Sequence, residues 1–151
     1  TLLRIMDDTN VRLKALDMSF SESAFPTLVD ASNSQLDVIA DVYGAMDCLN
    51  EGDGVRLTTF TKVLHRKRPY LLPLWDKRVK SCYCSGPEEG RRINPPEHYP
   101  TYPEFATQWL KAVQRDLKEN HKILYEFSKF ASQGVPVSQL RVLDIVAWKL
   151  G

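Results

Sequence analysis

The chain has 151 residues, of which 43% are hydrophobic and 26% are charged, and its formal net charge is +1. This composition is ordinary for a globular protein, and the length suffices for one domain with a hydrophobic core. No apolar run approaches the roughly 18 residues that a membrane-spanning helix needs, so we expect a soluble protein, one domain over residues 1–151, and no membrane partner.

The N-terminal part is the least readable. Four apolar side chains occur within residues 2–6, directly after Thr1, which is typical of an element already under way. We therefore expect a processed chain or a piece of a longer one. Residues 19–23 and Pro26 predict a loop, and a short strand is one interpretation of residues 11–13.

The middle of the chain has helical periodicity. A helix is predicted over residues 36–49, with Ser34 as its N-cap, and the glycine-bearing turn at residues 50–54 ends it. A second helix is predicted over 56–67, and Pro69 ends it because the residue before a proline is pushed out of the α region.

Asp76 is well placed to cap a third helix over residues 77–83. Residues 85–103 are rich in proline and glycine and predict a long exposed loop. Apolar stripes then predict helices over 104–118, 120–132 and 138–150. The fold class is therefore all-α, a compact multi-helix domain with one shared core. The residues expected in that core are Ile39, Tyr43, Leu64, Trp109, Phe127 and Leu143.

The three cysteines do not suggest a disulfide framework. Their odd count and the tight Cys82-x-Cys84 pair favour a reducing compartment, and we expect a cytoplasmic protein. Cys82, Cys84 and His98 have donor atoms suited to zinc, with Cys48 as a fourth, but the paired C-x-x-C spacing of zinc sites is absent. We therefore expect no metal and no cofactor.

The small net charge conceals two charged blocks. Residues 1–53 hold three basic and ten acidic residues, a net charge of −7, whereas residues 62–92 hold nine basic and three acidic residues, a net charge of +6. A basic block can bind phosphates even in a protein that is nearly neutral overall. The alternative is that these charges lie on solvated helix faces.

The stretch from Gly52 to Val79 combines a glycine-bearing turn, a helix, an apolar connection, Asp76 and a basic helix. A turn of this kind before a helix N-terminus directs backbone N–H groups outward, which makes a natural phosphate site. An aspartate among basic residues stays ionised while a DNA backbone can still approach it. The stretch therefore predicts a DNA contact.

The run from Thr61 to Asp76 resembles the signature of an uncharacterised bacterial family, in which a T-K-x-L segment leads into K-R-P-x-L-x-P-x-x-D. The tail from Leu140 to Trp148 is also similar to that family's ending. This family has no settled activity, so the resemblance implies membership without a function.

More distantly, Gly54 to Asp76 resembles the helix-hairpin-helix DNA glycosylase superfamily, in which a hairpin of L-P-G-V-G type leads through a helix to an aspartate on the cleft wall. Gly54 and Val55 match the hairpin's Gly-Val, whereas Arg56 replaces its second glycine. Lyase-active members carry a lysine where this chain has Thr58. The resemblance therefore implies a glycosylase-like fold and a monofunctional DNA N-glycosylase that acts on damaged or modified bases.

In that reading Asp76 is the catalytic residue, which stabilises the oxocarbenium-like sugar formed when an N-glycosidic bond breaks. Tyr70, Trp75 and Tyr83 are the predicted walls of the pocket for the extruded base. The predicted DNA-contacting residues are Gly52, Gly54, Arg56, Lys62, Arg66, Lys67, Arg68, Lys77, Arg78 and Lys80.

Two alternatives remain open. Asp76 can simply cap its helix while Trp75 lies in the core, and the chain can be a non-catalytic helical interaction domain. In the second case the loop at residues 85–103, or the contrast between the two charged blocks, docks a protein partner. Asp144, within an apolar run, is expected to bond Arg141 or a buried partner, since an unpaired buried carboxylate is costly.

Overall fold

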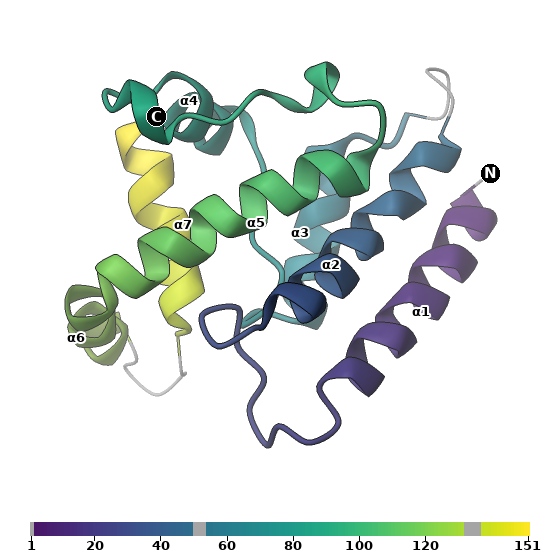
Figure 1. The fold of residues 1–151 in the computed structure, drawn as a ribbon, viewed down its shortest axis with the longest axis horizontal. Coiled ribbons are helices and arrows are strands. Elements are labelled where there is room, and N and C mark those ends of the chain that lie inside the picture. The colour runs from purple at the N-terminus through teal and green to yellow at the C-terminus, as the bar shows by residue number, and fades with distance from the viewer. Residues whose placement is uncertain (1, 50–53, 132–136) are drawn as a thin grey trace.

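A computed structural model describes residues 2–49, 54–131 and 137–151 (Figure 1). The described residues form α-helices and short 3-10 helices, and no β-strand occurs among them. The α-helices are α1 (Leu2–Ser19), α2 (Asn33–Val42), α3 (Leu57–Lys67), α4 (Lys77–Ser85), α5 (Tyr102–Glu119), α6 (His121–Ala131) and α7 (Gln139–Leu150). The 3-10 helices are η1 (Tyr43–Cys48), η3 (Glu89–Arg91) and η4 (Pro96–His98). The predicted all-α class is confirmed.

Within the described residues, no helix combines the length and apolar character that crossing a bilayer requires.

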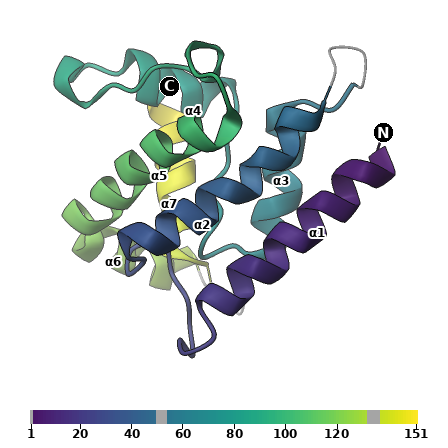
Figure 2. The same cartoon turned by 45° about the vertical axis from the view of Figure 1, so that its right-hand side comes forward.

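The first helix, α1, covers the segment in which a short strand at residues 11–13 was one interpretation, and the loop predicted around residues 19–23 and Pro26 follows it. Ile5, Leu13 and Leu16 are buried along one face, and that face packs on α2 (Figures 1 and 2). Arg12 holds the two helices together by donating to the Asp41 carboxylate at 2.7 Å. The predicted strand at residues 11–13 is therefore wrong, because a helical face satisfies the burial of this segment.

The helix predicted over residues 36–49 is confirmed in place but not in detail. Ser32, and not Ser34, is the N-cap of α2, and it forms a capping box in which Gln35 bonds back to the Ser32 backbone. The α-helix ends at Val42 and continues as the 3-10 helix η1.

The core surrounds α5, which crosses the middle of the molecule and packs against α2, α6 and α7 (Figure 1). Four aromatic rings meet along α5. Trp75 contacts Phe105 and Trp109 edge-on, with ring centroids 4.8 and 5.0 Å away, and Tyr43 contacts Trp109 at 5.6 Å. This aromatic cluster joins the segment just before Asp76 to the centre of the fold.

The last two helices, α6 and α7, lie at one end of α5, and α7 also packs against α4. Phe127 of α6 is 55% exposed, so its predicted place in the core is wrong. The other five predicted core residues are buried. Phe127 is exposed because α6 lies at the edge of the fold and buries Leu124, while Ile123, Tyr125 and Phe130 are exposed as well.

Candidate nucleic-acid interface

The predicted site begins at the turn before α3. Gly54 is exposed and has a backbone φ of 69°, a left-handed conformation that favours glycine. Arg56, at the N-cap position of α3, is exposed and makes no side-chain capping bond. The prediction for Gly52 lies outside the described residues.

The next part of the site is the extended segment at residues 72–75, which side chains of α3 hold in place. Thr61 Oγ1 is buried and accepts a hydrogen bond from the Trp75 N–H at 3.1 Å. His65 Nδ1 lies 2.7 Å from the Leu72 carbonyl oxygen, which requires that Nδ1 carry the proton and donate it. Burial lowers the pKa of His65, whereas the hydrogen bond to the Leu72 carbonyl oxygen raises it. Thr61 and His65 therefore have a structural role, because they hold the segment that leads to the start of α4.

At the end of that segment, Asp76 caps α4. Its Oδ1 atom accepts hydrogen bonds from the Arg78 and Val79 N–H groups, both at 2.9 Å. The predicted capping role is confirmed. The side chain is half-buried and is not sealed in the core. None of the three described cavities is lined by Asp76.

A second carboxyl group, that of Asp144 on α7, lies close enough to Asp76 for their charges to interact. It is buried, and its pKa is raised to about 8, chiefly by burial; the Leu74 amide and the Arg141 charge oppose that rise, and Asp76 reinforces it. Its Oδ2 atom has no hydrogen-bond partner among the described residues. Asp144 is therefore mostly neutral at pH 7, and it adds little negative charge to the surface above it.

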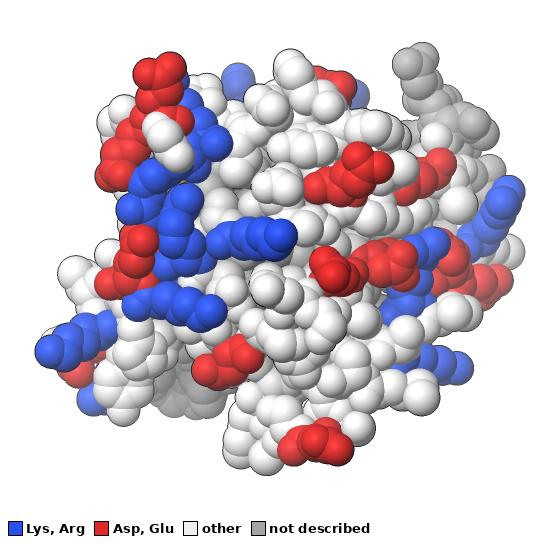
Figure 3. All heavy atoms as spheres, in the orientation of Figure 1, with Lys and Arg blue, Asp and Glu red and all other residues white. Residues whose placement is uncertain are grey.

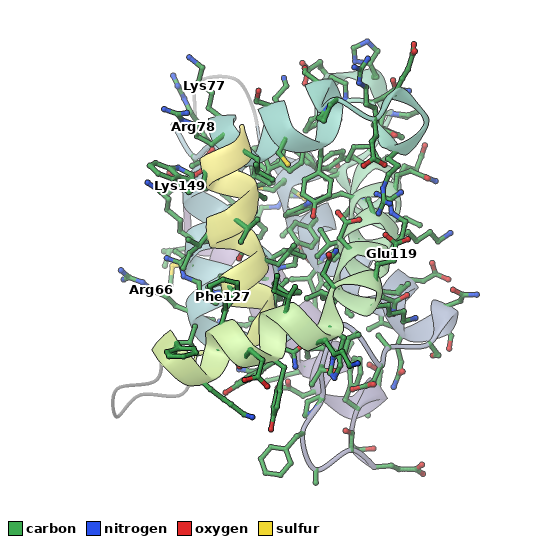
Figure 4. The ribbon with its side chains drawn as sticks, turned by 90° about the vertical axis from the view of Figure 1, so that its left-hand side faces the viewer. Arg66, Lys77, Arg78, Glu119, Phe127 and Lys149 are labelled. Carbon is green, nitrogen blue, oxygen red and sulfur yellow. The ribbon has the colours of Figure 1, made fainter. Side chains whose placement is uncertain are left out.

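That surface carries exposed cations from three helices. We call it the basic face and define it by Arg66 of α3, Lys77 and Arg78 of α4, and Arg141 and Lys149 of α7. Figure 4 shows Arg66, Lys77, Arg78 and Lys149 projecting on the same side of the molecule, along the edge of α7. Within the described part of the chain, none of the five forms an ion pair.

The other predicted cations have different surroundings. Arg68 donates through Nε to Asp17 of α1 at 2.8 Å, and Lys80 pairs with Glu97 at 2.6 Å. Their charges are already partly neutralised within the protein. Lys62 and Lys67 are exposed on α3, beside Arg66 in sequence, and form no ion pair with a described residue.

On the face seen in Figure 3, basic and acidic side chains lie next to one another on the left. Arg91 forms ion pairs with Asp116 and Glu119 of α5. This network borders a groove of about 530 Å³ that lies between the end of α4, α5, α6 and α7. Phe127 and Leu150 are among its apolar lining residues.

The three predicted base-pocket aromatics are not brought together. Trp75 is only 4% exposed and is enclosed by the aromatic cluster. Tyr83 is buried and lines the groove between α4 and α7. Tyr70 is exposed and lines a separate cavity of about 430 Å³ beside Phe25. The aromatic side chain that accompanies the basic face is Trp148, which sequence reasoning treated only as part of the C-terminal tail.

Two cations lie over the Trp148 ring. The Arg78 guanidinium carbon is 5.3 Å from the ring centroid, and Lys149 Nζ is 5.4 Å from it. Both distances lie within the range of cation–π attraction. The sequence signal that could have located this arrangement is an aromatic residue next to Lys149 in the last turn of an amphipathic helix.

The donor atoms considered for zinc do not gather. No cluster of three or more metal-binding side chains occurs in the part of the chain that the structure describes. The three cysteines are free, and burial raises the pKa of the Cys82 and Cys84 thiols. Both thiols therefore resist the deprotonation that metal binding requires.

Comparisons with known proteins give a family and no activity. No curated protein matches the chain, and no solved structure matches it. Residues 6–151 match the model of a family of unknown function, so the expected membership of an uncharacterised family is confirmed. The chain belongs to that family, DUF6308.

Proposed function

We propose that this protein binds DNA through the basic face. The observation that carries the proposal is that five exposed cations from α3, α4 and α7 form no ion pair with a described residue, and two of them lie over the exposed Trp148 ring. Lys and Arg side chains that neutralise phosphates release condensed counterions, and this release supplies most of the affinity of non-specific DNA binding.

The contrast with the rest of the molecule supports this choice. Arg12, Arg68, Lys80 and Arg91 all pair with carboxylates of the protein itself. The cations of the basic face have no such partners among the residues that the structure describes, and the nearby buried carboxyl group of Asp144 has a pKa raised to about 8 by burial. The surface therefore keeps its positive charge at neutral pH, which favours a polyanion as its partner.

The test is the salt dependence of binding to duplex DNA. Each phosphate that the protein neutralises contributes about 0.9 to the slope of log affinity against log salt. Changing Arg66, Arg78 and Lys149 together to Gln should therefore lower the slope by roughly 3 and weaken binding at low salt. Circular dichroism should show that the variant stays folded, because all three side chains are exposed.

The matched control changes Lys111, Lys118 and Lys122 to Gln. These lysines are exposed on α5 and α6, so the control removes the same net charge outside the basic face. We expect it to retain most of the slope. Equal losses in the two triple variants, or no binding of DNA by the unmodified protein at low salt, would overturn the proposal.

A second, catalytic function rests on Asp76. Its Oδ1 atom is engaged in the cap, while Oδ2 makes no hydrogen bond to a described residue, and the neutral Asp144 lies nearby. Gly54, with its left-handed backbone directly before α3, matches a hairpin glycine and supports a helix-hairpin-helix element. We propose that Asp76 acts as in a monofunctional N-glycosylase.

In that reaction the bond between C1′ and the base nitrogen breaks, and its electron pair leaves with the base. Water adds to C1′, and its proton goes to the departing base through solvent. Asp76 would stabilise the positive charge on the sugar and orient the water. Because none of the described cavities is lined by Asp76, this function requires DNA binding to open a pocket there.

The catalytic proposal is tested with Asp76→Asn, since asparagine also caps helices but carries no charge. Duplexes that contain damaged or modified bases are incubated with each protein, and the abasic sites formed are cleaved with alkali and counted. We expect excision by the unmodified protein and its loss in Asp76→Asn, with Asp37→Asn on the exposed face of α2 as the control. Equal excision by both proteins, or none by either, would end the catalytic assignment and leave DNA binding intact.

A further inference from the structure

We infer that the basic face prefers single-stranded nucleic acid, with the Trp148 ring as the platform on which one base stacks. This inference rests on the proposed DNA-binding function and goes beyond it by naming the form of the ligand. Its starting point is the exposure of a tryptophan side chain beside two cations, Arg78 and Lys149, that form no ion pair with a described residue.

Trp148 is far more exposed than the other two tryptophans. Trp75 and Trp109 are 4% and 0% exposed and form the aromatic cluster, whereas Trp148 is 43% exposed near the C-terminal end of α7. Holding an indole ring partly in water forgoes hydrophobic stabilisation that burial would supply. Tryptophan is enriched among the residues that contribute most to binding at interfaces.

The neighbours of Trp148 extend the platform along α7. Ile145 precedes Trp148 by three residues and is also exposed, so the two side chains lie on one helix face. Arg141 lies one turn further back along the same face. An apolar strip therefore runs between Arg141 at one end and the pair Arg78 and Lys149 at the other.

This arrangement fits a single strand better than a duplex. In a duplex the flat faces of the bases are already stacked on one another, so an exposed ring gains no contact with them. In a single strand the bases are available to stack on aromatic side chains, while flanking cations follow the phosphates. Trp148 stays 43% exposed with Arg78 and Lys149 beside it, and these two cations would attract the phosphates that flank a stacked base.

The experiment measures the binding of a fluorescein-labelled DNA strand of about a dozen nucleotides, alone and paired with its complement, by anisotropy at low salt. The proteins are the unmodified chain, Trp148→Ala and Trp148→Phe. We expect tighter binding of the single strand than of the duplex. We also expect Trp148→Ala to weaken single-strand binding by about tenfold, and duplex binding much less.

Trp148→Phe keeps an aromatic ring, so it should restore most of the single-strand affinity. Thermal unfolding of each variant shows whether the fold is intact, and the exposure of the ring predicts that it is. A second readout is intrinsic fluorescence, because Trp75 and Trp109 are buried and a stacked base should quench mainly Trp148.

The outcomes separate this inference from the proposed function. Tighter binding of the duplex, or equal effects of Trp148→Ala on both ligands, would overturn the single-strand preference and leave DNA binding standing. The absence of binding to either ligand at low salt would overturn both.

Discussion

Nδ1 of His65 lies 3.8 Å from Oδ2 of Asp144, and this contact between two buried side chains joins the inner face of α3 to that of α7. The distance is too long for a hydrogen bond, since Nδ1 donates instead to the Leu72 carbonyl oxygen at 2.7 Å. Burial lowers the pKa of His65 and raises that of Asp144 to about 8. At neutral pH the pair is therefore mostly uncharged.

The raised pKa of Asp144 predicts a specific pH dependence of stability. An aspartate of the unfolded chain titrates near 4, so between pH 4 and about 8 the folded chain binds more protons than the unfolded chain. The free energy of unfolding then falls as pH rises through this window, by up to about 1.4 kcal/mol per pH unit. The stabilisation is complete below pH 4 and lost above pH 8.

Urea unfolding of the unmodified protein and of Asp144→Asn at several pH values tests this. The difference in unfolding free energy between the two should shift in favour of Asp144→Asn as pH rises from 5 to 8.5, bracketing the raised pKa of about 8. His65 titrates in both proteins, so the comparison removes most of its contribution. Parallel pH profiles in the two proteins would contradict the raised pKa. The groups that interact with Asp144 are His65, Leu74, Arg141, Asp76, Tyr43 and Tyr83.

Thr61 should contribute more to the free energy of unfolding than Thr59, which lies on the same helix. Thr61 is fully buried, and its hydroxyl oxygen accepts from the Trp75 N–H at 3.1 Å. Thr61→Val leaves that buried N–H unpaired, which should cost about 1–3 kcal/mol in unfolding free energy. Thr59 is exposed on the same helix, and Thr59→Val is the matched control, with an expected change within about 0.5 kcal/mol. Similar unfolding midpoints for the two variants would show that the hydrogen bond is unimportant.

The helices of the C-terminal two thirds could be read from the sequence because their apolar stripes are regular and their caps conventional. Asp76 and Ser138 both accept hydrogen bonds from the N–H groups that their positions predicted. The helix α1 was missed because exposed apolar side chains, such as Val11 and Met18, obscure its buried stripe. Phe127 was misplaced because periodicity shows that a stripe exists, but not whether another element covers it.

The candidate site was only partly readable for a related reason. The basic residues around Asp76 are visible in the sequence, but their pairing depends on contacts between distant segments. Arg68 bonds to Asp17, which lies 51 positions away, whereas Arg66 forms no ion pair with a described residue. The association of Arg78 with Trp148 likewise depends on the packing of α4 against α7.

The cap of α2 offers a comparison of two serines. Ser32 accepts from the Gln35 N–H at 3.2 Å, while Ser34, in the first turn, bonds only to the Ser32 hydroxyl group. Ser32→Ala should reduce the unfolding free energy by about 1 kcal/mol, a typical value for the loss of an N-cap. Ser34→Ala should change it by a few tenths of a kcal/mol at most. Thermal unfolding of both variants decides the matter, and a larger effect at Ser34 would contradict the observed cap.

Gly54 should resist substitution although space surrounds it. A Cβ atom there would meet no other atom within 4 Å, but its φ of 69° lies in the left-handed region. Gly54→Ala should therefore cost about 1 kcal/mol, from backbone strain alone. Gly90→Ala is the control, because a Cβ atom there also meets open space and the backbone φ is not positive. Unfolding free energies that are equal in the two variants would contradict the strained conformation.

Arg66 and Arg68 provide the sharpest comparison between sequence and structure. Both are arginines in one basic run, and both were predicted to contact DNA, but only Arg68 is held by Asp17. Arg66→Gln should leave stability unchanged and lower the salt slope of DNA binding by about 0.9. Arg68→Gln should lower the slope less, because its charge is shared with a carboxylate, and should cost about 0.5 kcal/mol or less in stability because the pair is largely solvated. Paired salt titrations and urea unfolding of the two variants measure both effects. A larger slope change for Arg68→Gln than for Arg66→Gln would show that DNA displaces Asp17, and that the charges free in the unbound protein do not define the interface.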